Sequence, residues 1–132
     1  MIKEICTYVA TNTSFTIGTD LFALGTDPDE VDECIIVSES APGLANALLT
    51  DLRFIPLIVY SRAATRFTAR DNAYTVFNLL HGTQQVSLAA IGSGPVYVCN
   101  FSCRTAYYMG LDETGRRHTF ALAVDVHVTN ML

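Results

Sequence analysis

The sequence predicts an α+β fold: a mostly antiparallel β-sheet flanked by two main α-helices and closed by a C-terminal β-hairpin. Residues 119–129 alternate without a break between two sets of side chains, which is the period of a half-buried strand. Residues 69–81 repeat apolar side chains at helical spacing, and most other segments read as consecutive strands. Consecutive strands with few helices favour an antiparallel sheet. We expect residues 1–132 to form a single domain.

The N-terminal third is expected to hold one helix and several strands. Residues 2–11 place four apolar side chains on one helical face: Ile2, Ile5, Cys6 and Val9. Short strands are expected at 15–17 and 21–24, with a turn between them. Residues 34–37 are apolar at every position, which is typical of a central strand covered on both faces.

The middle third contains one segment whose secondary structure is not clearly indicated and the segment that best fits a helix. Residues 38–51 contain a Pro-Gly turn signal and several leucines, so a short helical turn or a loop is expected there. Residues 52–60 read as a strand. Pro56 cannot donate to a sheet ladder, which indicates an edge position or a bulge. The helix at 69–81 is expected to start at a Thr68 cap and to end at Gly82. Its predicted inward face consists of Ala69, Ala73, Val76, Phe77 and Leu80.

The C-terminal third reads as paired strands. Residues 86–91 and 97–103 should form a hairpin through the turn at 92–95. A second hairpin is expected around the polar turn 112–115, in which Gly115 supplies the positive φ angle. The long alternating strand then follows. Its predicted inward side chains are Phe120, Leu122, Val124, Val126 and Val128.

Composition narrows the functional classes. The net charge of −5 argues against nucleic-acid binding as the main task, because neutralising phosphates requires clustered Lys and Arg. No stretch approaches the roughly 20 apolar residues of a membrane span. The first residues lack the pattern of a signal peptide, so a cytoplasmic product is expected. All four cysteines lie in apolar patterns and are expected to be buried thiols.

The sequence offers no catalytic motif. None of the three histidines lies near another ligand at metal-binding spacing, and the acidic run lacks the glycine and terminal glutamate of a calcium loop. Gly92-Ser93-Gly94 lacks the lysine of a phosphate loop and precedes no helix. We therefore expect no enzyme activity, no cofactor and no metal.

Three passages lie in order along most of the chain, and each of them encodes turns and caps. The passages are Gly18-Thr19-Asp20-Leu21-Phe22, residues 57–82 with their Leu80-His81-Gly82 end, and Tyr108-Met109-Gly110-Leu111-Asp112-Glu113-Thr114-Gly115-Arg116. In this order, they resemble passages of the tail terminator or minor capsid proteins of long-tailed bacteriophages. The chain departs from the family pattern at 38–51, which is leucine-rich where relatives tend to have a short Gly/Pro turn.

The resemblance implies a structural virion protein that is assembled in the host cytoplasm. Such proteins form a hexameric ring at the head-proximal end of the tail tube. The ring stops tube growth and offers a docking face to head-completion or neck proteins, so the implied partners are copies of the chain, the tube protein and the neck protein. Genomic DNA would pass through the lumen without specific binding. An acidic inner surface suits this passage, because like charges repel. The residues expected at the lumen or a stacking face are Asp27, Asp29, Glu30, Asp32 and Glu33.

Two segments are candidates for contacts between subunits. The polar tip of the last hairpin is long enough to reach a neighbour, and the alternative is a solvated turn. The leucine-rich segment could fold onto a partner ring, and the alternative is packing on its own domain. The candidate contact residues are Leu44, Leu48, Leu49, Asp112, Glu113, Arg116 and Arg117.

Other functions stay open at the level of the sequence. A head-completion or neck connector protein shares the small size and the ring symmetry of a tail terminator. A small cytoplasmic ligand-binding or regulatory domain belongs to a different class, and a metabolite retained through purification would favour it. An enzyme would need a convergent polar cluster in a pocket, which the sequence does not suggest.

Overall fold

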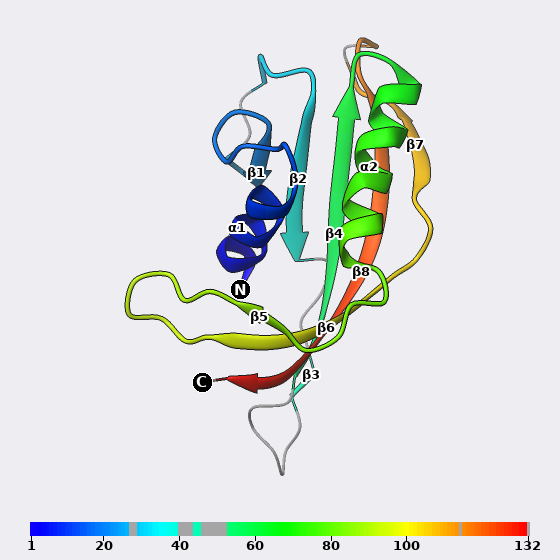
Figure 1. Ribbon diagram of the computed structural model, residues 1–132. Helices are drawn as coiled ribbons and strands as arrows, with labels where there is room; N and C mark the ends of the chain where they lie inside the picture. The colour runs from blue at the N-terminus through cyan, green and yellow to red at the C-terminus, as the bar shows by residue number, and fades with distance from the viewer. Residues whose placement is uncertain (27–28, 40–43, 46–52, 114, 132) are drawn as a thin grey trace.

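The computed structural model describes residues 1–26, 29–39, 44–45, 53–113 and 115–131 (Figure 1). These residues form two helices and one eight-stranded sheet, which confirms the predicted α+β class. The elements are α1 (Ile2–Asn12), β1 (Leu21–Ala23), β2 (Cys34–Glu39), β3 (Leu44–Ala45), β4 (Arg53–Ala63), α2 (Arg66–Leu80), β5 (Val86–Leu88), β6 (Tyr97–Cys103), β7 (Tyr107–Leu111) and β8 (His118–Met131). Neither described helix has the length and hydropathy needed to cross a membrane.

Two long strands, β4 and β8, form the centre of the sheet. They pair antiparallel along the whole of β4, from Arg53 opposite Val128 to Ala63 opposite His118. The strand order is β1-β2-β4-β8-β6-β5, and the β1–β2 pair is parallel. β3 also pairs with β4, and β7 also pairs with β8. Each central strand is therefore hydrogen-bonded on both sides over much of its length.

Both helices pack on the same face of the sheet. Ile5 and Val9 of α1, and Val76 and Leu80 of α2, share one core cluster with the inward side chains of the central strands (Figure 1). The predicted alternation of the last strand is confirmed, because all five inward residues are buried: Phe120, Leu122, Val124, Val126 and Val128. The predicted inward face of α2 is confirmed at four positions, and Phe77 is partly buried.

The opposite face of the sheet carries a smaller apolar cluster. Phe22, Cys34 and Ile36 are buried there, with Tyr60 packed against them. β2 is thus buried on both faces, as the continuous apolar run predicted. The four cysteines are buried thiols, which confirms that prediction as well.

Two expected strands differ in the structure. Residues 15–17 do not form a strand, because the Thr16 carbonyl accepts hydrogen bonds from the amides of Thr19, Asp20 and Leu21 and turns the chain. The strand expected at 86–91 ends at Leu88. Its pairing with β6 as a hairpin is confirmed.

Pro56, expected at an edge position or a bulge, lies inside the central strand β4, so β4 is not an edge strand. Pro56 pairs with Asp125 of β8. On its other side, the pairs with β2 end at Leu57 and the pairs with β3 begin at Phe54. On this side, Pro56 therefore lies between the residues of β4 that pair with β2 and those that pair with β3. The N–H that proline lacks removes no described hydrogen bond of the sheet there.

The cap of α2 also differs from the prediction. The helix begins at Arg66, and the Thr65 side chain accepts a hydrogen bond from the Thr68 amide. Thr65 rather than Thr68 is therefore the N-cap. At the other end, Gly82 has a φ of 77°, as expected of the residue after a helix.

The C-terminal hairpin forms as predicted. β7 and β8 pair antiparallel, and Gly115 in the turn has a φ of 70°. The register shifts between Tyr108 and Gly110, which makes Met109 the extra residue of a bulge. Leu44 and Ala45 form the short strand β3 instead of a helical turn. Residues 40–43 and 46–52, with Leu48 and Leu49, lie outside the described residues.

Candidate functional site

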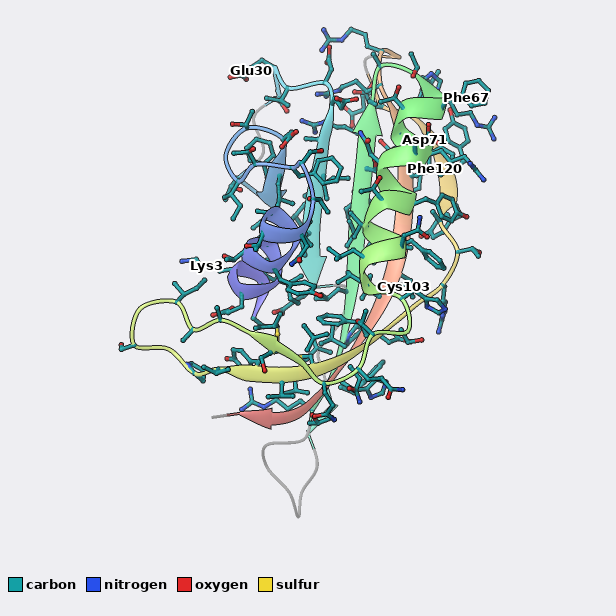
Figure 2. The ribbon with its side chains drawn as sticks, in the orientation of Figure 1. Lys3, Glu30, Phe67, Asp71, Cys103 and Phe120 are labelled. Atoms are coloured by element: carbon teal, nitrogen blue, oxygen red, sulfur yellow. The ribbon has the colours of Figure 1, made fainter. Side chains whose placement is uncertain are left out.

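The acidic residues singled out in the sequence lie in the connection from β1 to β2. Asp29, Glu30, Asp32 and Glu33 are all exposed, and Figure 2 shows Glu30 at one end of the molecule. Asp27 lies outside the described residues. The structure therefore presents a short acidic surface, here called the acidic connection (Asp29, Glu30, Asp32 and Glu33).

Two arginines fix the acidic connection to the sheet. The Arg117 guanidinium donates to the backbone oxygen of Asp29 at 2.8 Å and to that of Val31 at 3.3 Å. Arg62 of β4 also donates to the Val31 oxygen at 2.8 Å. These bonds hold the backbone of the connection, so the carboxylates of Glu30 and its neighbours project from a fixed support.

Arg117 is only 7% exposed, and it works within its own chain. Its Nε donates to Oδ2 of Asp112 at 2.6 Å, and this hydrogen bond raises the pKa of Arg117 above its ordinary value. Asp112 also accepts from the backbone amide of Arg116 at 3.2 Å. Within the chain, the Arg117–Asp112 pair joins the hairpin tip to the acidic connection. The predicted contact of these residues with another subunit stays a prediction.

The other predicted contact residues have different surroundings. Glu113 and Arg116 are exposed at the hairpin tip. A small cleft of about 310 Å³ lies between this tip and the acidic connection, lined by Asp29, Asp112, Glu113, Arg116 and Arg117. Leu44 lies in β3, and the two further leucines of that segment fall outside the described residues.

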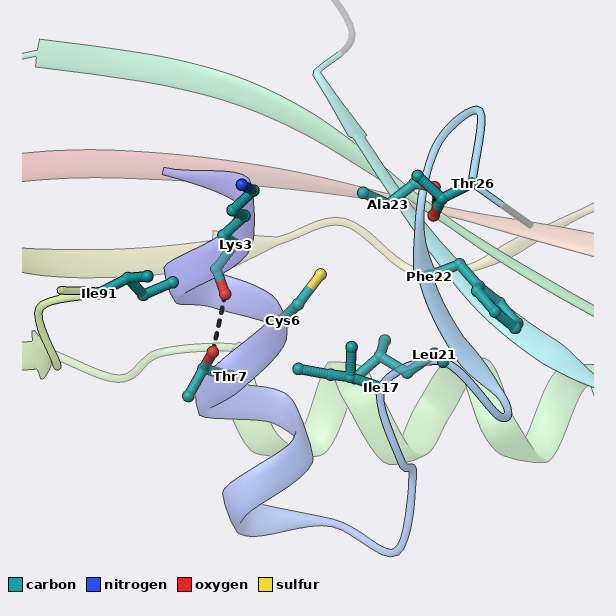
Figure 3. A pocket seen from close by; sticks show the side chains of 10 residues that line it. Lys3, Cys6, Thr7, Ile17, Leu21, Phe22, Ala23, Thr26 and Ile91 are labelled. Carbon is teal, nitrogen blue, oxygen red and sulfur yellow. Dashed lines mark hydrogen bonds between the residues drawn. The ribbon is translucent and has the colours of Figure 1, made fainter.

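A larger hollow lies elsewhere among the described residues, and it was not expected from the sequence. It is a groove of about 580 Å³ between α1 and the edge strand β1 (Figure 3). Leu21 and Phe22 of β1 line one wall, and Cys6 and Thr7 of α1 line the other. Ile91 reaches it from the β5–β6 connection. The sequence could have indicated this groove only through three exposed apolar residues: Ile17, Leu24 and Ile91. They lie in separate loops and form no shared pattern, so the sequence did not predict the groove.

Strand β7 carries a second apolar surface. Tyr107, Met109 and Leu111 are 52%, 53% and 54% exposed. Between them, Tyr108 turns to the core side, where the Arg66 guanidinium lies 4.3 Å from the centre of its ring. An exposed apolar strand of this kind is typical of a contact surface. We call Tyr107, Met109 and Leu111 the β7 edge.

Two histidines form hydrogen bonds within the chain, and the thiols are buried. His81 accepts a hydrogen bond from the Cys103 amide at 3.0 Å, and His118 Nδ1 lies 2.8 Å from the Tyr108 hydroxyl. Burial raises the pKa of the Cys6 thiol to about 11 and that of Cys103 to about 12, which keeps both protonated at neutral pH. The described residues hold no group of three or more side chains that could bind a metal ion.

Comparison of the chain with protein-family models, with curated proteins and with solved structures found no match.

Proposed function

We propose that this chain is a structural virion protein, the tail terminator of a long-tailed bacteriophage. In this proposal, copies form a hexameric ring at the head-proximal end of the tail tube. The ring stops polymerisation of the tube protein and offers a docking face to the head-completion or neck protein. The protein acts by assembly rather than by catalysis, and it needs no cofactor.

The observation that carries the proposal is the acidic connection and its support. Its four exposed carboxylates stand on a backbone held by Arg117 and Arg62. DNA phosphates are repelled by fixed negative charge, so such a surface suits a lumen through which DNA passes without binding. The buried Arg117 fixes the backbone of this connection through its bond to the Asp29 oxygen, and its side-chain hydrogen bond goes to Asp112.

The hairpin supplies further support. The passage that resembles the phage family includes Asp112 and leads directly to Arg117, and these two residues form the pair that orders the hairpin tip. Gly115 adopts the positive φ that the turn requires. The resemblance therefore falls on residues that determine how the tip and the acidic connection meet.

Electron microscopy of particles from a phage that lacks this gene tests the proposal. Overlong tubes without heads are expected if the protein terminates the tail. Tails of normal length beside unattached, filled heads would instead assign it to a neck or joining role. Normal virions would refute both assembly functions and favour a regulatory or ligand-binding domain.

Complementation of the same phage tests the acidic connection. The wild-type gene is compared with Glu30→Lys/Asp32→Lys and with Glu39→Lys/Asp71→Lys, a control that makes the same charge change at exposed acids elsewhere. We expect the first variant to lower infectivity strongly and the control to restore it. Full infectivity with Glu30→Lys/Asp32→Lys would contradict the placement of the acidic connection at the lumen.

A further inference from the structure

The two sides of the sheet expose unlike apolar surfaces. β1 ends the strand order on one side and borders the groove, while β7 lies on the opposite side and pairs only with β8 among the described strands (Figure 1). The groove is concave and about 580 Å³ in volume. The β7 edge is a strand with a bulge at Met109, which places an exposed side chain outside the regular ladder.

We propose that the groove beside β1 binds the β7 edge of a second copy of this chain. In this contact, Tyr107, Met109 and Leu111 of one copy enter the groove between α1 and β1 of the next. The contact buries on both copies apolar surface that a single copy leaves in water, at a gain of roughly 25 cal/mol per Å². The inference names the subunit contact of the proposed ring and so rests on the proposed function.

The balance of charge on the two sides favours this pairing. The side that carries the groove has an excess of acids: Asp20 next to β1 and the four carboxylates of the acidic connection. They stand against Lys3 in the groove and the Arg62 and Arg117 guanidinium groups that bind the backbone of the connection. The side that carries β7 is basic. Arg66 lies over Tyr108 of β7, Arg70 lies one turn further along α2, and Arg104 precedes the strand, against Asp71 and Glu113. Figure 2 shows Glu30 and Lys3 on one side of the molecule and Phe67 and Asp71 on the other. Opposite charges on two docking surfaces guide their encounter and fix their orientation.

The position of the surfaces determines the symmetry of the product. Because the two surfaces lie on opposite sides and differ from each other, the contact is heterologous: each copy uses its groove for one neighbour and its β7 edge for another. Such a contact closes into a ring or continues as a filament, and it cannot end at a symmetric dimer. A heterologous contact therefore differs from a pairing of two β7 edges, which would give a symmetric dimer.

Cysteine cross-linking tests the contact. Ile17→Cys places a thiol at the groove rim, and Met109→Cys places one on the β7 edge. Four samples are treated with a short bismaleimide: each single variant alone, a mixture of the two single variants, and the double variant. Each sample is tested as free protein at high concentration and in assembled tails. Ser102→Cys, exposed on β6, replaces Met109→Cys in the matched control. Wild-type protein gives the background, which should be low because the native thiols are buried.

The expected pattern is specific to a heterologous contact. Each single variant alone should stay uncross-linked, the mixture should give a dimer and nothing larger, and the double variant should give a ladder. Adding Tyr107→Glu and Leu111→Glu to the Met109→Cys variant should abolish the dimer. The inference is overturned if the mixture matches the Ser102→Cys control in both the free protein and the tails. It is also overturned if Met109→Cys alone forms the dimer, since that product is a symmetric edge pairing.

The two failures can be told apart. Overlong tails in the gene-deleted phage, combined with no Ile17–Met109 cross-link, would mean that the ring closes through other surfaces and only the inference fails. A cross-linked ladder combined with normal tails would mean that the chain assembles through this contact but does not terminate tails, so only the proposed function fails.

Discussion

Strands β7 and β8 are hydrogen-bonded neighbours, yet they place their apolar side chains in opposite environments. Leu122 and Val124 of β8 are fully buried, whereas Met109 and Leu111 of β7 are more than half exposed. β8 has partner strands on both sides, and helix α2 packs over its inner face. Among the described strands, β7 pairs with β8 alone. Burial in this sheet is therefore decided by position across the sheet and not by residue type.

The contrast separates two uses of apolar residues. The side chains of β8 stabilise the single chain, because folding removes them from water. The side chains of the β7 edge contribute little to that stability and are available to another molecule. Substitutions of the same residue type in the two environments should therefore have very different effects on unfolding, and three matched pairs test how far this contrast extends.

The largest effect is expected for the pair Leu122 and Leu111. Leu122→Ala should lower the free energy of unfolding by about 2 to 5 kcal/mol, because it leaves a cavity between β8 and the helices. Leu111→Ala should change it by less than about 0.5 kcal/mol, since the side chain already contacts water. Equilibrium denaturation in urea measures both. Similar losses for the two variants would show that the β7 edge is covered in the free protein.

The second pair, Arg117 and Arg116, contrasts two neighbours in one turn. Arg117→Ala should cost about 1.5 to 3 kcal/mol, because it removes charged hydrogen bonds to Asp112 and to the acidic connection. Arg116→Ala, at an exposed side chain, should cost less than about 1 kcal/mol. Urea denaturation again gives the values. In Arg117→Ala, the amides of residues 29–31 should also exchange hydrogen faster, and unchanged exchange would mean that Arg117 does not hold the connection.

Local patterns predicted the parts of the fold that depend on neighbours in sequence. The alternation of β8, the inward face of α2 and the Gly115 turn all follow from side chains a few residues apart. Pro56 shows where such patterns stop. Its effect depends on where β2 and β3 end along β4, and that is set by the chain at distant positions.

The candidate surfaces were only partly predictable for the same reason. The acidic residues could be identified as exposed, because charge is rarely buried without a partner. Nothing local distinguishes Arg117 from Arg116, since the decisive partner, the Asp29 carbonyl, lies 88 positions away. The groove is assembled from α1, the β1 region and the β5–β6 connection, so no single stretch of sequence carries its signature.

The smallest effect is expected for Thr65 and Thr68, at the end of α2 that lies beside β7. Thr65→Ala should lower the free energy of unfolding by about 1 kcal/mol, because it removes the acceptor for the Thr68 amide at the helix start. Thr68→Ala removes only a hydroxyl that bonds to the Thr65 hydroxyl at 2.8 Å, and alanine is the better helix former. It should therefore cost less than Thr65→Ala in the same urea titration.

Thr65 and Thr68 show that exposed side chains are not always neutral to stability, unlike those of the β7 edge. Thr65 is exposed, as Leu111 is, yet its hydroxyl satisfies a backbone amide that the helix leaves without a partner. An exposed position is thus neutral to unfolding only where no backbone group depends on the side chain. If Thr68→Ala proves the more costly change, the helix in solution begins at the later threonine, and exposure alone would then predict the effect at Thr65.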